Sequence, residues 1–176
     1  MRDRVSDYLE QWREQRPELP RAPMSVTGRV SRASDLIGQG MRGFFAEHDL
    51  QPGEHDVLAA LRRAGAPYTL TPGALTASMM VTAAAMTNRL GRLEDKGLVA
   101  RTTDPNNRRS VLVSLTDDGL SVIEHVAPLH AAAEGELLGA LDDTELAELA
   151  GLLEKLLAGL GDASQREDGA GDARDR

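Results

Sequence analysis

Apolar residues recur every three or four positions along most of the chain, which is the spacing of an amphipathic α-helix. The pattern stops at Pro17 and Pro20, returns over about residues 25–47, and begins again after Pro52. The apolar positions are Val5, Tyr8, Leu9 and Trp12 in the first helix, Val26, Val30, Ala33, Ile37, Met41 and Phe44 in the second, and Val57, Leu58, Leu61 and Ala64 in the third. Three helices are therefore predicted before residue 65.

Helix start signals then divide the middle of the chain into two short helices. Thr71 followed by Pro72 is typical of an N-cap with proline at the first helical position, and it predicts a helix to about Ser78. The next apolar stripe covers about residues 82–96 and is followed by a glycine, which commonly ends a helix. Two short helices with a tight connection form a helix-turn-helix.

Beyond this pair the sequence becomes β-prone. The segments LVART (98–102) and SVLVSLT (110–116) are separated by TDPNNRR, which is a turn-forming and basic segment. A β-hairpin is therefore predicted, with Arg108 and Arg109 at its tip.

Two more helices are expected toward the C-terminus. Thr116 is a candidate N-cap for a helix through about Leu141, and Asp142 with Glu145 has the spacing of a capping box. The last helix carries a leucine stripe: Leu146, Leu149, Leu153, Leu156 and Leu160. A lone helix cannot bury such a stripe, so a partner surface is required. Residues 161–176 are rich in Gly and Asp and are predicted to be a disordered tail.

The distribution of charge changes how these elements are interpreted. The chain has a net charge of -8, which would repel nucleic acid if it were evenly spread. Residues 71–116, however, contain six basic and three acidic residues, so the helix-turn-helix and hairpin are locally basic. The chain has no cysteine, which excludes disulfides and thiolate metal sites. It has no apolar signal core and no apolar run of membrane length, so we expect a cytoplasmic protein without a membrane partner.

A helix-turn-helix followed by a basic hairpin is the winged helix-turn-helix plan, in which the second helix enters the major groove of DNA. On a helical wheel Met86, Leu90 and Leu93 point to the core. The predicted DNA-binding residues are those on the opposite or flanking face of this helix and at the hairpin tip: Ala84, Thr87, Asn88, Arg92, Arg108 and Arg109. Gly91 shares that outward face and allows close approach to the bases.

The segments MTNRLGRLEDKGLVART (86–102) and DPNNRRSVLVSLTDDG (104–119) resemble the recognition helix and wing of MarR-type transcriptional regulators, and the resemblance extends over about residues 29–160. It implies an obligate homodimer, built from the first long helix and the last two helices, that binds a pseudo-palindromic operator in double-stranded DNA. The expected fold is mainly α with a small β-hairpin wing. In the family an aspartate usually stands where this chain has Asn107, so its wing lacks the usual ion pair with Arg109.

A finer resemblance concerns the effector. Trp12, Asp56, Arg89 and Arg101 have the residue types and places that line a ligand pocket in the urate-responsive branch of the MarR family. Guanidinium groups bind planar anions through charge-assisted hydrogen bonds, and a tryptophan offers an aromatic surface. The resemblance implies a repressor released from DNA by a small anionic metabolite, urate or a related purine, with Asp56 paired to an arginine in the empty site. Aconitate, citrate or a phenolic compound is an alternative effector.

The expected organisation is an extra N-terminal helix and linker over residues 1–23, a helical dimerisation region over 24–52 and 117–160, and a DNA-binding lobe over 53–116. No nucleophile motif or phosphate-binding glycine loop is present, so we do not expect an enzyme, and no cofactor is expected. A regulatory metal at His125, His130 and Glu134 is a weaker alternative, because a spacing of five does not place two imidazoles on one helical face. A dimerisation module that does not bind DNA is the other alternative, and the basic wing argues against it.

Overall fold

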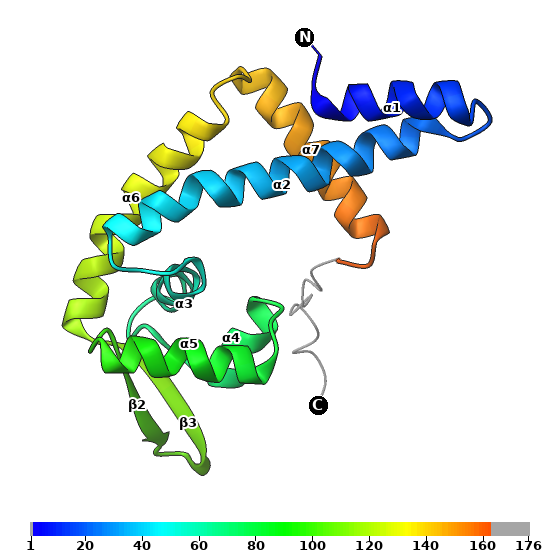
Figure 1. The fold of residues 1–176 in the computed structure, drawn as a ribbon. Helices are drawn as coiled ribbons and strands as arrows, with labels where there is room; N and C mark the ends of the chain where they lie inside the picture. The colour runs from blue at the N-terminus through cyan, green and yellow to red at the C-terminus, as the bar shows by residue number, and fades with distance from the viewer. Residues whose placement is uncertain (1, 163–176) are drawn as a thin grey trace, which may run out of the picture. The chain divides into compact units, whose positions relative to one another are not determined.

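The computed structural model describes residues 2–162, and the chain divides into two compact units, Met1–Leu137 and Leu138–Arg176. Within residues 2–162 the first unit contains six helices and a small sheet, and the second contains one helix (Figure 1). The fold is therefore mainly α with a small β-sheet, as predicted. The boundary between the two units falls inside the expected dimerisation region, so the assignment of residues 24–52 and 117–160 to one region stays a prediction. From residue 163 onward the expected tail lies outside the described residues.

Two helices form the N-terminal part of the first unit. Helix α1 (Arg4–Gln15) begins at Asp3, whose side chain accepts a hydrogen bond from the backbone amide of Ser6. Helix α2 (Arg21–Glu47) runs alongside it (Figure 1). It starts four residues before the predicted Ser25, because Pro23 lies in its first turn, where a helix needs no backbone N–H.

The predicted helix-turn-helix is present. Helix α3 (Pro52–Arg63) is followed by α4 (Pro72–Ser78) and α5 (Ala83–Asp95). Thr71 and Thr82 are the N-caps of α4 and α5, and each hydroxyl accepts a hydrogen bond from the backbone amide three residues later. These caps satisfy amides that would otherwise have no partner, so they fix where the two short helices begin.

The hairpin is also present, but it belongs to a three-stranded sheet. Strands β2 (Val99–Asp104) and β3 (Asn107–Leu115) are antiparallel, and β3 also pairs with β1 (Thr69–Leu70), so the strand order is β1-β3-β2. The sequence did not predict β1, since two residues are too few to show a period. The short strand joins the base of the wing to the loop between α3 and α4.

Helix α3 lies at the centre of the first unit, between α2, α5 and α6 (Figure 1). Val57, Leu58 and Leu61 of its apolar stripe are fully buried, whereas Ala64 just beyond the helix is exposed. Met86, Leu90 and Leu93 of α5 pack into the same core, as predicted. The other buried members of this core are Met41, Phe45, Leu50, Ala60, Leu75, Leu98, Val99, Val113, Ile123 and Val126. One continuous core therefore joins α2 and α6 to the lobe that carries α5 and the wing.

Helix α6 (Asp117–Leu137) holds the base of the wing in place. The Thr116 hydroxyl accepts a hydrogen bond from the Gly119 amide at 3.0 Å and donates one to the Gly97 carbonyl at 2.7 Å. Gly119 is buried, and a Cβ there would overlap the carbonyl oxygen of Leu98. Thr116 is thus the predicted cap of α6, although the helix ends at Leu137 rather than Leu141.

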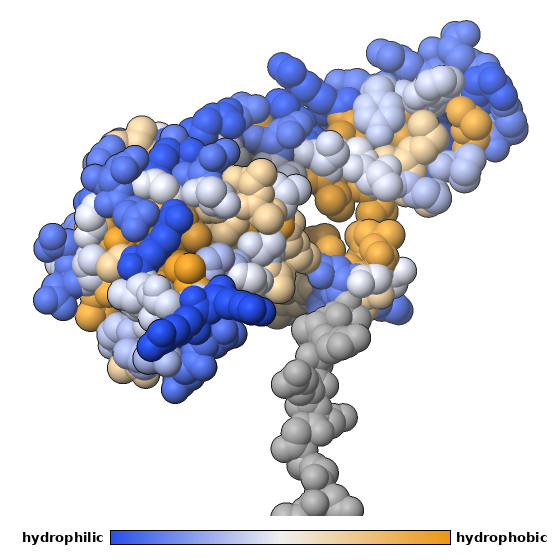
Figure 2. Space-filling model, turned by 90° about the horizontal axis from the view of Figure 1, so that it is seen from below, coloured by the Kyte–Doolittle hydropathy of each residue, from blue (hydrophilic) through white to orange (hydrophobic). Residues whose placement is uncertain are grey.

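Helix α7 (Asp143–Gly159) forms the second unit. Asp142 and Glu145 make the predicted capping box, in which each side chain accepts a hydrogen bond from the backbone amide of the other. Within this fully described helix none of the residues is buried, and the most exposed large apolar side chains are Leu149, Leu152, Leu156, Leu157 and Leu160. In the first unit, apolar atoms also reach the surface of the arm made by α1 and α2 (Figure 2), where Val26, Val30, Leu36 and Ile37 are exposed.

No helix among residues 2–162 is both long enough and apolar enough to cross a membrane.

Candidate nucleic-acid interface and effector cavity

The outward face of α5 is small and polar. Ala84, Thr87 and Asn88 are exposed, and the Thr87 hydroxyl donates a hydrogen bond to the Ala83 carbonyl at 2.9 Å. Small side chains on this face allow the helix axis to approach a groove closely, and the Asn88 amide is free to reach base edges. The geometry of this face is the one expected of a recognition helix.

The tip of the wing presents two adjacent arginines to solvent. Arg108 and Arg109 are exposed, and within residues 2–162 neither takes part in an ion pair. Asn107 accepts a hydrogen bond at 3.2 Å from the backbone amide of Arg109, and its side chain therefore shapes the turn. Both guanidinium groups remain available for phosphates.

The cations around α5 have protein partners. The Arg89 side chain lies across Gly53, where a Cβ would be 2.5 Å from the guanidinium carbon. Arg101 on β2 pairs with Glu94 at 3.3 Å. Arg92 and Lys96 both point to the first turn of α3. The basic stretch from residue 86 to 102 is thus directed in part at the protein's own acids and backbone, and not wholly at DNA.

Glu54 is the acid that receives two of these cations, and the sequence prediction missed it. Its side chain is fully buried, and its carboxylate accepts hydrogen bonds from Arg92 Nε at 2.7 Å and Lys96 Nζ at 3.1 Å. Burial acts to raise the pKa of Glu54, but hydrogen bonds from Arg92, the Gln51 amide and Lys96 outweigh it, so the net shift is downward. Glu54 is therefore ionised near neutral pH. It could have been found, because it shares the helical stripe of Val57, Leu58 and Leu61.

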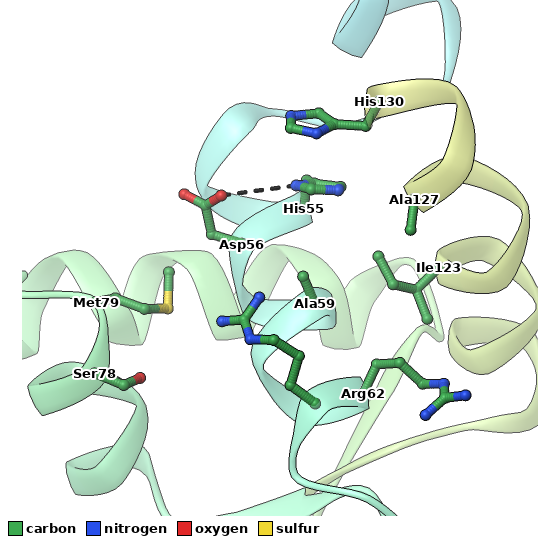
Figure 3. Close-up of a pocket in the computed structure, with 10 residues that line it drawn as sticks. His55, Asp56, Ala59, Arg62, Ser78, Met79, Ile123, Ala127 and His130 are labelled. Carbon is green, nitrogen blue, oxygen red and sulfur yellow. Dashed lines mark ion pairs between the residues drawn. The ribbon is translucent and has the colours of Figure 1, made fainter. Parts of the chain in front are cut away.

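A cavity of about 540 Å³ lies between α3, the end of α4 and α6 (Figure 3). Its wall on α3 is mostly polar and includes two arginines, and its wall on α6 is apolar apart from His130. The lining residues are His55, Asp56, Ala59, Arg62, Arg63, Ser78, Met79, Ile123, Ala127 and His130. Helix α3 therefore has two contacts: it forms one wall of this cavity, and through Glu54 it holds α5.

Two stacked imidazoles form one end of this cavity. The rings of His55 and His130 are 4.2 Å apart and nearly parallel (Figure 3). Both ring nitrogens of His55 are buried without a hydrogen-bond partner within the described part of the chain, and its Nδ1 is 3.7 Å from Asp56. Burial lowers the pKa of His130, and the adjacent His55 lowers it further, against smaller opposing effects of Glu134 and Asp56. His130 is therefore uncharged near neutral pH, and the sequence prediction missed the stacking of the two rings.

The four predicted effector residues do not line one cavity in the single chain. As far as residues 2–162 go, only Asp56 lies in the cavity wall, and it is largely exposed there without an arginine partner. The Arg89 side chain extends from α5 to Gly53 at the start of α3, and Arg101 lies on β2 of the wing. Arg62 also lines the cavity and pairs with Glu124.

Trp12 lies on α1 and is 41% exposed. The helix that carries it is held against α2 by two contacts. The Tyr8 hydroxyl donates a hydrogen bond to the Met24 carbonyl at 2.9 Å, and Asp3 pairs with Arg29 at 2.8 Å. Hydrogen bonds from Ser6, aided by Arg29, lower the pKa of Asp3 to about 2. Helix α1 is therefore attached to α2 at its N-terminal end, with Trp12 one turn from its other end.

The metal alternative gains no support from the geometry. His130 lies 3.5 Å from Glu134, but His125 is next to His48 instead. Among the residues that the structure describes, no group of three His, Cys, Asp or Glu side chains is arranged to hold a metal ion.

Comparison with known proteins decides the family. Residues 48–110 match the model of the MarR family. The regulator PecS of Dickeya dadantii is 38% identical over 152 residues, which are 86% of this chain and 92% of PecS. The chain belongs to the MarR family. It is therefore a DNA-binding transcriptional regulator with a winged helix-turn-helix, and it is not an enzyme.

Solved structures agree with this assignment. A mutant MarR from E. coli complexed with operator DNA has a TM-score of 0.69 and 27% sequence identity, over 83% of this chain and 97% of that one. BpsR of Bordetella bronchiseptica, whose structure addresses the regulation of DNA binding by 6-hydroxynicotinic acid, has a TM-score of 0.67 and 26% identity, over 74% of this chain and 97% of BpsR. MarR-family regulators bind operator DNA as dimers.

Proposed function

We propose that this MarR-family protein is a repressor that a small planar anion, such as urate or a related purine, releases from its operator. The observation that carries the proposal is the cavity whose α3 wall also bears the ionic contacts to the recognition helix. A ligand that displaces this wall acts on α5 through contacts that are already formed. Release then requires that the ligand bind the DNA-incompetent state more tightly than the DNA-bound state. The difference between these two binding free energies equals the free energy by which the ligand weakens operator binding.

The composition of the cavity supports an anion of this kind. Arg62 and Arg63 stand against the single carboxylate of Asp56 in the cavity wall, so a negative ligand meets guanidinium groups that can donate charge-assisted hydrogen bonds. The stacked rings of His55 and His130 add a flat surface suited to a planar molecule. The regulation of BpsR by 6-hydroxynicotinic acid shows that a MarR relative responds to a planar aromatic acid.

There are two alternative sets of residues that could contact this ligand, and Asp56 belongs to both. The first set adds Trp12, Arg89 and Arg101, following the resemblance to the urate-responsive branch. The second adds His55 and His130, which flank Asp56 in the cavity. The two sets make different predictions for single substitutions.

The test is a titration of a fluorescent operator duplex and the protein with urate, xanthine, citrate and aconitate, in which DNA release is measured by anisotropy. Urate or xanthine should release the wild-type protein. Because a lost charge-assisted hydrogen bond costs about 1.5 to 3 kcal/mol, Arg89→Ala should raise the half-releasing concentration roughly 10- to 150-fold. If His130→Ala does so and Arg89→Ala does not, the cavity set is the correct one.

Arg13→Ala is the matched control, since Arg13 is an exposed arginine of α1 that pairs with Glu10. It should leave the half-releasing concentration unchanged. Trp12→Phe should weaken the response with little effect on DNA affinity. The proposed effector class is wrong if no anion in the panel releases the wild-type protein from DNA that it binds.

A further inference from the structure

The contact between Glu54 and α5 is the most deeply buried ionic cluster among the described residues. Glu54 is 0% exposed, whereas its partners Arg92 and Lys96 are 42% and 28% exposed at their side chains. The carboxylate also accepts the backbone amide of Gln51 at 3.1 Å, which closes the capping box of α3. Its Oε1 accepts the hydrogen bond from Arg92, and its Oε2 accepts those from Lys96 and the Gln51 amide.

The two cations occupy one side of α5. Arg92 and Lys96 are four residues apart, so they lie one above the other on the helix, and Lys96 also donates a hydrogen bond to the Asp49 carbonyl. Asn88 and Thr87 lie on the outward face. A rotation of α5 about its axis would therefore move the base-reading face and break the contacts of Glu54 together.

The apolar core and the contacts of Glu54 constrain the rotation of α5 in different ways. Met86, Leu90 and Leu93 are buried, but apolar packing is non-directional and tolerates small rotations. Hydrogen bonds to a charged carboxylate have narrow distance and angle requirements. A buried, ionised acid at the start of α3 can thus fix an orientation that the leucines leave partly free.

We propose that Glu54 is a positioning residue for DNA recognition, which fixes the rotation of α5 and withholds Arg92 and Lys96 from the phosphate backbone. This differs from the sequence expectation that Arg92 contacts DNA. Sequence discrimination then depends on an acid that never touches DNA. The proposal concerns DNA binding alone and is independent of any effector.

The test compares wild-type protein with Glu54→Gln on two duplexes: an inverted repeat that the wild type selects from a random pool, and a scrambled duplex of the same composition. Glutamine keeps the size of the side chain but removes its charge, which frees both cations. The ratio of specific to scrambled affinity should fall about 10-fold. The slope of log affinity against log salt should steepen by about 1 to 2, because each new phosphate contact adds about 0.9.

Asp95→Asn is the charge-matched control. Asp95 is exposed at the end of α5, and no ion pair within residues 2–162 involves it. Removing its charge should change the affinities for both duplexes by the same factor and leave their ratio intact. If Glu54→Gln lowers thermal stability but keeps both the ratio and the salt slope of the wild type, Glu54 has only a structural role and the proposal is wrong.

Arg92→Gln tests the same contact from the other helix, and it is usable even if Glu54→Gln fails to fold. If Arg92 positions α5, its loss lowers the affinity ratio about 10-fold and leaves the salt slope unchanged. If Arg92 contacts a phosphate directly, its loss flattens the slope by about 1 and weakens both duplexes equally, which would overturn the proposal.

Discussion

A chain carrying Leu152→Glu and Leu156→Glu is expected to sediment as a monomer at micromolar concentration and to bind operator DNA at least about 100-fold more weakly. Both leucines are exposed on α7 of the single chain, at 67% and 40%. In a dimer each fully buried leucine contributes about 1.5 to 3 kcal/mol, so the pair on one chain alone accounts for roughly 10²- to 10⁴-fold in dimer affinity, and both chains carry the change. Buried, unpaired carboxylates would add a further penalty.

The matched control is Ala147→Glu with Ala158→Glu, which places two new acids on the opposite face of the same helix. That variant should stay dimeric in sedimentation velocity. A dimeric Leu152→Glu, Leu156→Glu variant would show that α7 lies outside the dimer interface.

The wing carries the second large expected effect. Replacing Arg108 and Arg109 with alanine should weaken binding to all duplexes by a similar factor, roughly 10- to 100-fold, and should flatten the salt slope by about 2. Both side chains are exposed and without an ion pair among the described residues, so the substitution should leave folding unchanged. Affinity is measured by anisotropy over a salt series.

Asn88→Ala provides the contrast. Its amide lies on the outward face of α5, so the substitution should change the preference among operator variants and leave the salt slope unchanged. An Arg108→Ala, Arg109→Ala variant with unchanged affinity and slope would show that the wing does not contact phosphates.

Local signals were sufficient to predict most of the fold. Thr71, Thr116 and Asp142 each cap a helix where the sequence indicated. Capping depends on a side chain and an amide three residues away, so it can be read from a short segment. Strand β1 was missed for the opposite reason, because its pairing with β3 joins Thr69 to Ser114 across 45 residues.

The candidate site was harder to predict because its groups meet through the tertiary fold. The pairing of Glu54 with Arg92 spans 38 residues, and the stacking of His55 on His130 spans 75 positions of the printed sequence. One signal was available: an acid on the apolar stripe of α3 and a basic stripe at Arg89, Arg92 and Lys96 on α5. Since an unpaired buried charge is costly, such an acid predicts a cation opposite it. It does not predict which helix supplies that cation.

Sequence-specific operator binding by a dimer is tested most directly by titrating wild-type protein onto the selected inverted repeat and onto its scrambled counterpart at one fixed salt concentration. Binding should saturate at two chains per duplex, with half-sites about one helical turn apart and an affinity at least about 10³-fold above that for scrambled DNA. Equal affinity for the two duplexes, or saturation at one chain per duplex, would contradict it.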